Sequence, residues 1–146
     1  MKELVMNAAN LFIEKDIKLL RLKVYELAVS HRIAVHMENL IYNDDKYAQI
    51  KEFDPNIDCE YDKIIDAEKL NESGRPIRPD ILVHVRESDI NLIAIEIKKD
   101  STDTWDYSKL KTLTNQNGKY KYKLGAFIYF PNNVPKYKWF INGDQV

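Results

Sequence analysis

The sequence predicts a single domain of the α/β class, with a mixed central sheet flanked by helices. Two observations carry this prediction. Apolar residues recur at helical spacing through the first forty residues, as they do in amphipathic helices. Residues 81–85, 92–97 and 124–130 are instead short apolar runs of the kind found in buried strands. A chain of 146 residues is close to the usual size of one domain, so we expect residues 1–146 to share one core.

The first half of the chain is expected to form two helices and a strand. The helical pattern breaks or bends near Asp16, and residues 43–45 are expected to end the second helix. A strand should follow at about residues 57–65. Residues 66–78 contain a glycine and a proline, so they are expected to form a loop.

The second half of the chain adds strands around a third helix. Residues 87–90 separate two of the strand-like runs and are expected to form a hairpin turn. Residues 104–113 carry apolar side chains at mixed helical spacing, and Ser101 or Asp103 would cap this helix. A short strand is expected at residues 137–141. The predicted order is therefore helix, helix, three strands, helix, strand, strand.

The composition excludes several classes of protein. Hydrophobic residues make up 45% and charged residues 31%, a balance that fits a soluble globular protein rather than a disordered tail or a membrane protein. The apolar runs are too short to span a bilayer, and Met1-Lys2-Glu3 does not begin a signal peptide. Cys59 is the only cysteine, which excludes a disulfide framework and a cysteine zinc site and predicts a reducing, cytoplasmic setting.

Acidic and basic side chains gather where two of the predicted strands meet. Side chains alternate across a strand, so Glu96 and Lys98 share one face of a strand whose other face is apolar. A hairpin turn centred near Ser88 places Asp80 on that same face, opposite one of these two residues, with Cβ atoms roughly 5 Å apart. Two carboxylates at this separation repel each other unless a cation lies between them.

This arrangement predicts a site for a hard divalent cation. Mg²⁺ prefers oxygen ligands and keeps several waters, and Mn²⁺ is an alternative ion. Lys98 beside the ion could hold or polarise an attacking water and could offset the charge of a phosphate. The spacing alone is a common pattern, however, and the same residues could be ordinary surface charges at exposed strand ends.

The motif Pro79-Asp80 followed by Glu96-Ile97-Lys98 resembles the signature of the PD-(D/E)XK nuclease superfamily, which has the restriction-endonuclease-like fold. The predicted order of elements is similar to the αβββαβ core of that fold, with an extra N-terminal helix. The combination looks like that of small bacterial and phage members, and the resemblance covers about residues 20–130. It implies that Asp80 and Glu96 are ligands of Mg²⁺ or Mn²⁺ and that Lys98 is the catalytic lysine.

Members of the superfamily often add an acid from the helix before the first strand. Glu38 is the candidate for this catalytic and metal-binding role, because it shares a helical face with His31. A solvated Glu38 is an equally good interpretation, and Glu60 is the other candidate for the acid. His84 shares the face of Asp80 and could touch the site, although a histidine packed beside the sheet is the more common case.

Basic residues concentrate late in the chain and interleave with tyrosines. Such a mixture could hold a phosphate backbone and stack bases, whereas lysines also solvate a surface or blunt an edge strand. Asp106, earlier in this region, is interpreted as a helix-start charge that favours the positive end of the helix dipole. The candidate nucleic-acid contacts are Lys109, Lys119, Lys121 and Tyr122.

The leading hypothesis is a metal-dependent nuclease that hydrolyses phosphodiester bonds of nucleic acid, with DNA as the expected substrate. A formal net charge of −1 argues against it, because many nucleic-acid binders are strongly basic. The alternative is a catalytically silent protein of the same fold that binds a partner or nucleic acid within a larger assembly. A homodimer would enlarge its contact surface. Hydrolysis of another phosphate compound is a third hypothesis, because a fold does not determine a function.

Overall fold

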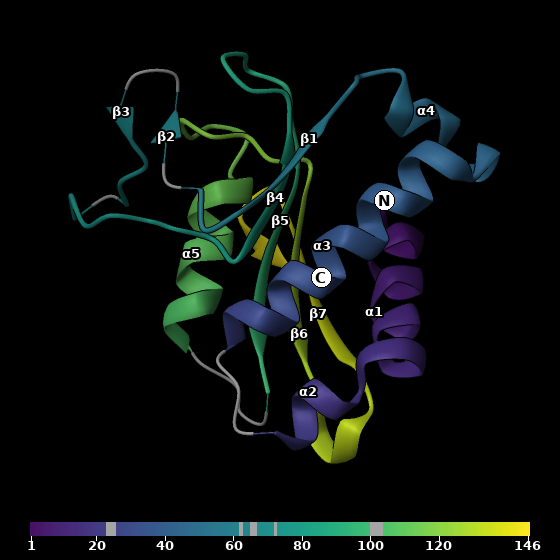
Figure 1. Cartoon of the computed structure of the whole chain (residues 1–146). Helices are drawn as coiled ribbons and strands as arrows, with labels where there is room; N and C mark the ends of the chain where they lie inside the picture. Colours follow the sequence, from purple (N-terminus) through teal and green to yellow (C-terminus); the bar gives the residue numbers. More distant parts are fainter. Residues whose placement is uncertain (23–25, 62, 65–66, 72, 100–103) are drawn as a thin grey trace.

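A six-stranded mixed sheet forms the centre of the molecule in the computed structural model, which describes residues 1–22, 26–61, 63–64, 67–71, 73–99 and 104–146 (Figure 1). The strand order is β1-β4-β5-β6-β7-β8, with β5 and β6 parallel and the other neighbours antiparallel. A separate antiparallel pair is formed by β2 and β3. The strands are β1 (Asn56–Cys59), β2 (Lys63–Ile64), β3 (Ala67–Glu68), β4 (Ile81–His84), β5 (Asn91–Lys98), β6 (Leu124–Tyr129), β7 (Lys136–Ile141) and β8 (Asp144–Gln145).

Helices cover both faces of this sheet, as the α/β prediction requires. Figure 1 shows α1 and α3 on one face and α5 on the other. Within the described residues, no helix combines the length and the apolar character that crossing a bilayer requires. The helices are α1 (Lys2–Asp16), α2 (Lys18–Arg21), α3 (Glu26–Asn43), α4 (Ala48–Lys51) and α5 (Thr104–Thr114), with the 3-10 turns η1 (Asp45–Tyr47) and η2 (Pro131–Asn133).

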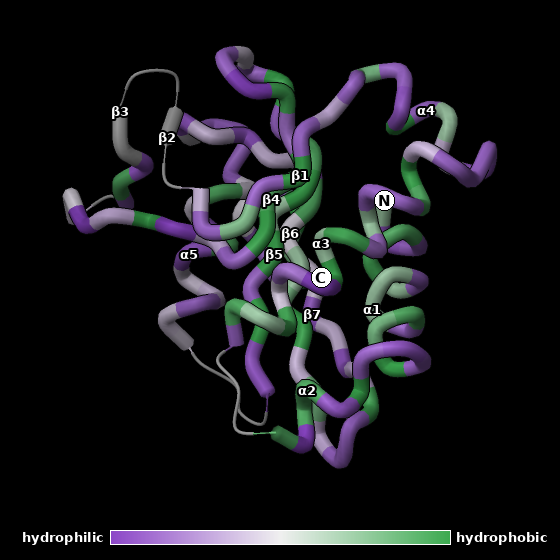
Figure 2. The backbone as a smooth tube through the Cα atoms, viewed as in Figure 1, coloured by the Kyte–Doolittle hydropathy of each residue, from purple (hydrophilic) through white to green (hydrophobic). Residues whose placement is uncertain are grey.

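Two apolar clusters lie on the two faces of the sheet, and β5 contributes to both because its side chains alternate. Ile95 packs with residues of α1 and α3, whereas Ala94 packs with residues of α5. Figure 2 shows the apolar residues concentrated along the central strands. Glu96, the neighbour of Ile95, therefore lies on the α5 side of the sheet.

The predicted ends of the first two long helices are confirmed. α1 ends at Asp16 and α3 ends at Asn43. The Asp16 carboxylate accepts a hydrogen bond from Arg32 Nε at 3.1 Å and lies 2.7 Å from His36 Nε2. These contacts tie the end of α1 to α3 and fix the layer that covers this face of the sheet.

The single strand expected at residues 57–65 is instead two strands, β1 and β2, while residues 62 and 65 lie outside the described residues. β1 ends at Cys59, and Glu60 adopts a left-handed backbone conformation with a φ of 51°. Such a conformation interrupts the extended backbone of a strand. The loop expected at residues 66–78 also contains β3 and an isolated bridge.

The last helix and the two strands after it follow the prediction closely, whereas β8 was not predicted. α5 covers Thr104–Thr114, and β6 and β7 lie at the two segments expected to be strands. The capping residues expected for α5, Ser101 and Asp103, lie outside the described residues.

The hairpin between β4 and β5 has the predicted pairing. Ile81 pairs with Ile95, and the register shifts only near the turn. Asp80, which directly precedes β4, and Glu96 of β5 are the next residues outward along the hairpin. Both therefore lie on the α5 side, at the end of the hairpin that is far from the turn.

Gly125 of β6 lies beneath α5 without room for a side chain. A Cβ atom at this position would lie 3.0 Å from both Phe140 Cβ and Thr114 Cγ2, which is closer than side chains normally pack. We expect Gly125→Ala to lower the free energy of unfolding by roughly 1–3 kcal/mol, the usual cost of overpacking a core. Thermal melts of the two proteins measure the effect, and an unchanged midpoint would contradict the close packing of α5 on β6.

Candidate active site

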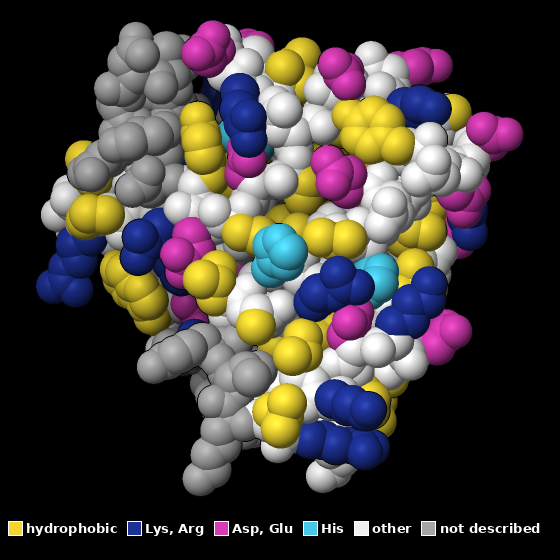
Figure 3. Space-filling view, viewed as in Figure 1, with side chains coloured by type: hydrophobic (Ala, Val, Ile, Leu, Met, Phe, Trp, Pro, Cys, Tyr) yellow, Lys and Arg dark blue, Asp and Glu magenta, His cyan; other side chains and the backbone are white. Residues whose placement is uncertain are grey.

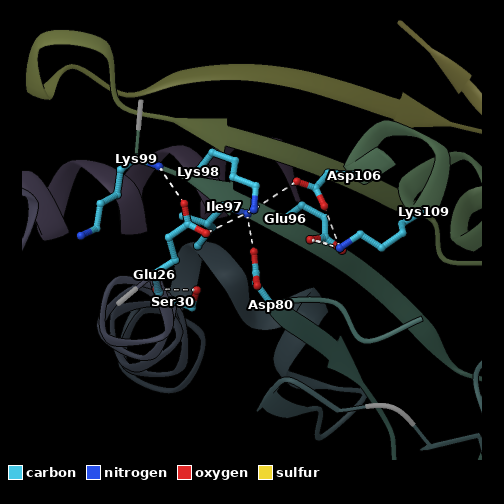
Figure 4. Close-up of polar contacts among 9 residues, drawn as sticks. All are labelled: Glu26, Ser30, Asp80, Glu96, Ile97, Lys98, Lys99, Asp106 and Lys109. Carbon is cyan, nitrogen blue, oxygen red and sulfur yellow. Dashed lines mark hydrogen bonds and ion pairs between the residues drawn. The ribbon is translucent and has the colours of Figure 1, made fainter. Parts of the chain in front are cut away.

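Among the described residues, six charged side chains from the sheet and two helices meet at the C-terminal end of β5 (Figure 4). The structure brings together the three residues that the strand geometry predicted and adds three others. We call this group the carboxylate–lysine cluster. It consists of Glu26 from α3, Asp80 before β4, Glu96 and Lys98 from β5, and Asp106 and Lys109 from α5.

The Asp80 carboxylate is held against β5 by the backbone. Its Oδ2 atom accepts a hydrogen bond from the Ile97 amide at 2.6 Å. Burial raises the pKa of Asp80 to about 6, although the Ile97 amide and the charges of Lys109 and Lys98 favour the ionised form. Ionised Asp80 would therefore be stabilised further by a cation placed next to it.

Glu96 is an almost fully buried acid, with 1% of its surface exposed. Lys109 Nζ donates a hydrogen bond to Oε2 at 2.7 Å, but Oε1 has no hydrogen-bond partner among the described residues. Burial raises the pKa of Glu96 well above its usual value, and the charge of Asp80 raises it further against the opposing effect of Lys109. A buried polar atom without a partner is costly, so Glu96 Oε1 is an acceptor available to a ligand.

Lys98 lies between α3 and α5. Its Nζ atom donates a hydrogen bond to Glu26 Oε2 at 3.2 Å and lies 3.5 Å from Asp106 Oδ2. Burial alone would lower the pKa of Lys98, but the charges of Asp106 and Glu26 outweigh it and hold the pKa above its usual value. Lys98 is therefore an ammonium group at neutral pH.

α5 places a second acid–lysine pair in the site. Lys109 Nζ lies 2.7 Å from Asp106 Oδ1 and 2.7 Å from Glu96 Oε2. Asp106 shares a helical face with Leu110 and Leu113, and all three are buried. This spacing was a signal in the sequence that Asp106 faces the sheet. Asp106 also lies in the first turn of α5, as its interpretation as a helix-start charge predicted.

The cluster carries more negative than positive charge. The described side chains supply four carboxylates and two ammonium groups. This excess, together with the unpartnered Glu96 Oε1, fits the oxygen donors and charge that Mg²⁺ or Mn²⁺ prefers. As the described side chains stand, no three carboxylate, histidine or cysteine groups are arranged to hold a metal ion.

Glu26, not Glu38, is the acid that α3 brings to this cluster. Glu38 is exposed and lies about 18 Å from Glu26 along the helix axis, given the rise per residue of an α-helix. The prediction of Glu38 as a site residue is therefore wrong, because the N-terminal end of α3 is the end that reaches Lys98. Helical periodicity marks the face that meets the sheet but not which end lies near the site.

Two other candidates do not join the contacts of the cluster. Glu60 is exposed, and its amide donates a hydrogen bond to the carbonyl oxygen of Asp80 at 3.2 Å. His84 Nε2 lies 3.0 Å from Asp58 Oδ2, and the imidazole centre is 4.9 Å from that of Tyr61. His84 is therefore a histidine packed beside the sheet.

The predicted nucleic-acid contacts do not form one surface. Lys119 and Lys121 are exposed, whereas Lys109 is turned into the carboxylate–lysine cluster. Tyr122 is completely buried, so it cannot stack on a base and its prediction is wrong. Figure 3 shows one face of the molecule, on which basic and acidic side chains are interspersed.

An exposed aromatic side chain lies next to the cluster on α5. Trp105 directly precedes Asp106, lies four residues before Lys109 and is 40% exposed. The guanidinium carbon of Arg75 lies 6.0 Å from the centre of the Trp105 ring. A flat aromatic surface beside a cation is the chemistry by which proteins bind unpaired bases and the phosphates that join them.

No protein-family model, curated protein or solved structure matches the chain. Its function is therefore inferred from the geometry, burial and charge of these side chains.

Proposed function

We propose that this chain is a metal-dependent nuclease that hydrolyses phosphodiester bonds of nucleic acid, with DNA as the expected substrate. One observation carries the proposal. Asp80 and the buried Glu96 lie at neighbouring strand ends beside Lys98, and Glu96 keeps an oxygen without a hydrogen bond among the described residues. Burial raises the pKa of both acids, and a bound divalent cation would reverse that effect.

Each residue has a role that its position supports. Asp80 and Glu96 would hold Mg²⁺ or Mn²⁺, and the ion would supply the positive charge that activates water and stabilises a phosphoryl group. Lys98, kept charged by Asp106 and Glu26, would orient the attacking water or stabilise charge that develops on the phosphate. Glu26 would act on the reaction through its contact with Lys98 and is a positioning residue.

The order of elements supports the proposed family. α3, the antiparallel strands β1, β4 and β5, then α5 and the parallel strand β6 follow one another as in an αβββαβ core. α1 would then be the extra N-terminal helix, and β2 and β3 an insertion between the first two core strands. We therefore propose the restriction-endonuclease-like fold for this chain.

The surroundings of the cluster favour nucleic acid over a smaller phosphate compound. Trp105 offers an exposed ring next to Asp106, and Arg75 supplies a cation over that ring. A base could stack on Trp105 while the adjoining phosphate lies at the carboxylates. A substrate without a base would leave this surface unused.

Calorimetric titration with Mg²⁺ and Mn²⁺, followed by incubation with plasmid and single-stranded DNA, tests the proposal. Wild-type protein should bind metal and cleave. Glu96→Gln keeps the size of the side chain but removes its charge, so metal binding should weaken and cleavage should slow by at least about 100-fold. Glu38→Gln, which changes an exposed acid on α3, is the matched control and should behave as wild type. Wild-type cleavage by Glu96→Gln would refute the assignment.

A catalytically silent protein of the same fold is the second candidate function. The contact of Lys109 with Glu96 favours it, because an ammonium group already neutralises this carboxylate. The formal net charge of −1 also argues against unaided binding to nucleic acid. Wild-type protein that binds no metal but co-purifies with a specific partner, or forms a dimer, would support this function instead.

A further inference from the structure

We propose that the Lys109 ammonium is a resident counter-cation that a divalent metal ion must displace from Glu96. The inference rests on the proposed function, because it concerns the same metal site. It adds a positioning role for a lysine on α5 that the strand motif does not contain.

The contacts of Lys109 place its charge where a metal ion would be needed. Its Nζ atom lies 2.7 Å from Glu96 Oε2 and 2.7 Å from Asp106 Oδ1, and so bridges an acid of β5 and an acid of α5. The Lys109 side chain is only 13% exposed. A buried ammonium group that bridges two buried carboxylates supplies the charge that a cation would otherwise provide.

The Glu96 oxygen that Lys109 leaves unused points to a second cation. Glu96 Oε1 is buried and has no hydrogen-bond partner among the described residues, whereas Asp106 Oδ2 lies 3.5 Å from the Lys98 ammonium group. Lys109 thus satisfies one oxygen of each carboxylate, and Lys98 already faces the second oxygen of Asp106. A metal ion bound to Glu96 would lie next to Lys109, and two cations in a buried site repel each other strongly.

The Lys109 ammonium group can move away from Glu96 and still keep a partner on its own helix. Its flexible four-carbon stem allows the ammonium group to move, and Asp106, three residues earlier, can remain its partner. In the absence of metal, the ammonium group keeps Glu96 from being buried without any counter-charge. In the presence of metal, it moves away from Glu96 but stays beside the site.

Replacement of Lys109 with methionine tests the inference, because methionine keeps an unbranched apolar side chain without the charge. Metal-free Lys109→Met should bind Mn²⁺ at least about tenfold more tightly than wild type in calorimetry. A charge this close changes the equilibrium constant with which a carboxylate binds a proton by roughly one to three powers of ten, and we expect a comparable effect on cation binding. In the presence of a metal chelator, the melting temperature of Lys109→Met should fall below that of wild type. Saturating Mn²⁺ should remove most of this difference.

Two further variants separate charge from structure. Lys109→Arg keeps the positive charge and should keep the Mn²⁺ affinity near that of wild type. Lys111→Met makes the same substitution at an exposed position of α5 and should change neither the affinity nor the melting temperature in chelator. If Lys109→Met does not fold without metal, Lys109→Gln replaces it in the titration.

The outcomes distinguish this inference from the proposed function. Tight Mn²⁺ binding by Lys109→Met with none by wild type would support the displacement inference and show that the natural chain is the silent protein. Equal affinities in wild type and Lys109→Met would overturn the inference and leave the nuclease proposal standing. Mn²⁺ binding by neither protein would overturn both.

Discussion

Asp80→Asn is expected to abolish metal-dependent cleavage while it stabilises the metal-free protein at pH 8. Asparagine keeps the shape of the side chain and an oxygen for the Ile97 amide, which donates to Asp80 Oδ2 at 2.6 Å. It removes the charge that would bind the metal, so the cleavage rate should fall by about 1,000-fold or more. It also removes a carboxylate whose ionisation opposes folding.

The direction of the stability change follows from the raised pKa. Asp80 has a pKa of about 6 in the folded protein and an ordinary value of 3.8, so the folded protein binds the proton more tightly than the unfolded chain. The stabilisation from this proton is complete below the ordinary value and is lost as the pH rises to 6 and above. A shift of about two units corresponds to roughly 3 kcal/mol. Because Asp80 is partly exposed, we expect Asp80→Asn to recover on the order of 2 kcal/mol at pH 8.

Urea unfolding in chelator at pH 4 and pH 8 measures this effect. The stability gain of Asp80→Asn should be present at pH 8 and small at pH 4, where Asp80 of the wild type is protonated in the folded protein. Asp89→Asn, at an exposed position in the hairpin turn, is the control and should change stability little at either pH. A less stable Asp80→Asn at pH 8 would contradict the raised pKa.

Phe127→Ala is expected to cause the largest loss of stability among these variants. Phe127 is fully buried, and its ring centre lies 4.9 Å from that of Tyr107 on α5 and 5.8 Å from that of Tyr129. It also pairs with Glu96 in the parallel register between β6 and β5. Loss of the ring would leave a cavity beneath α5 and next to the carboxylates, so the free energy of unfolding should fall by about 3–5 kcal/mol.

Chemical denaturation of Phe127→Ala beside Phe53→Ala tests this prediction. Phe53 is 41% exposed and its ring lies under the ammonium group of Lys123, so its loss should cost less than about 1 kcal/mol. Equal losses in the two variants would show that Phe127 does not anchor α5. Such a result would also show that packing against Phe127 does not hold Asp106 and Lys109 at the sheet.

The parts of the site that the sequence predicted are those that depend on one hairpin. Alternation along β5 places Glu96 and Lys98 on one face. The pairing of Ile81 with Ile95 brings Asp80 alongside Glu96. Both relations are local, since a short turn sets the register and the register sets which side chains meet.

The same local signals predicted most of the elements. The end of α1 at Asp16, the end of α3 at Asn43 and the late strands agree with periodicity and turn residues. β1 is shorter than expected because Glu60 leaves the extended conformation, and hydrophobic patterning does not report the backbone angle of a single exposed residue.

The sequence by itself thus determined the α/β class and the meeting of Asp80, Glu96 and Lys98, because periodicity and hairpin register are properties of short segments. Only the tertiary structure decided which helical charges complete the cluster. Glu26 takes the place expected for Glu38 because the N-terminal end of α3 lies at the end of β5. Lys109 forms an ion pair with Glu96 because α5 packs on the sheet through Leu110 and Leu113. The position and direction of a helix across a sheet depend on packing between distant segments, and no local pattern encodes them.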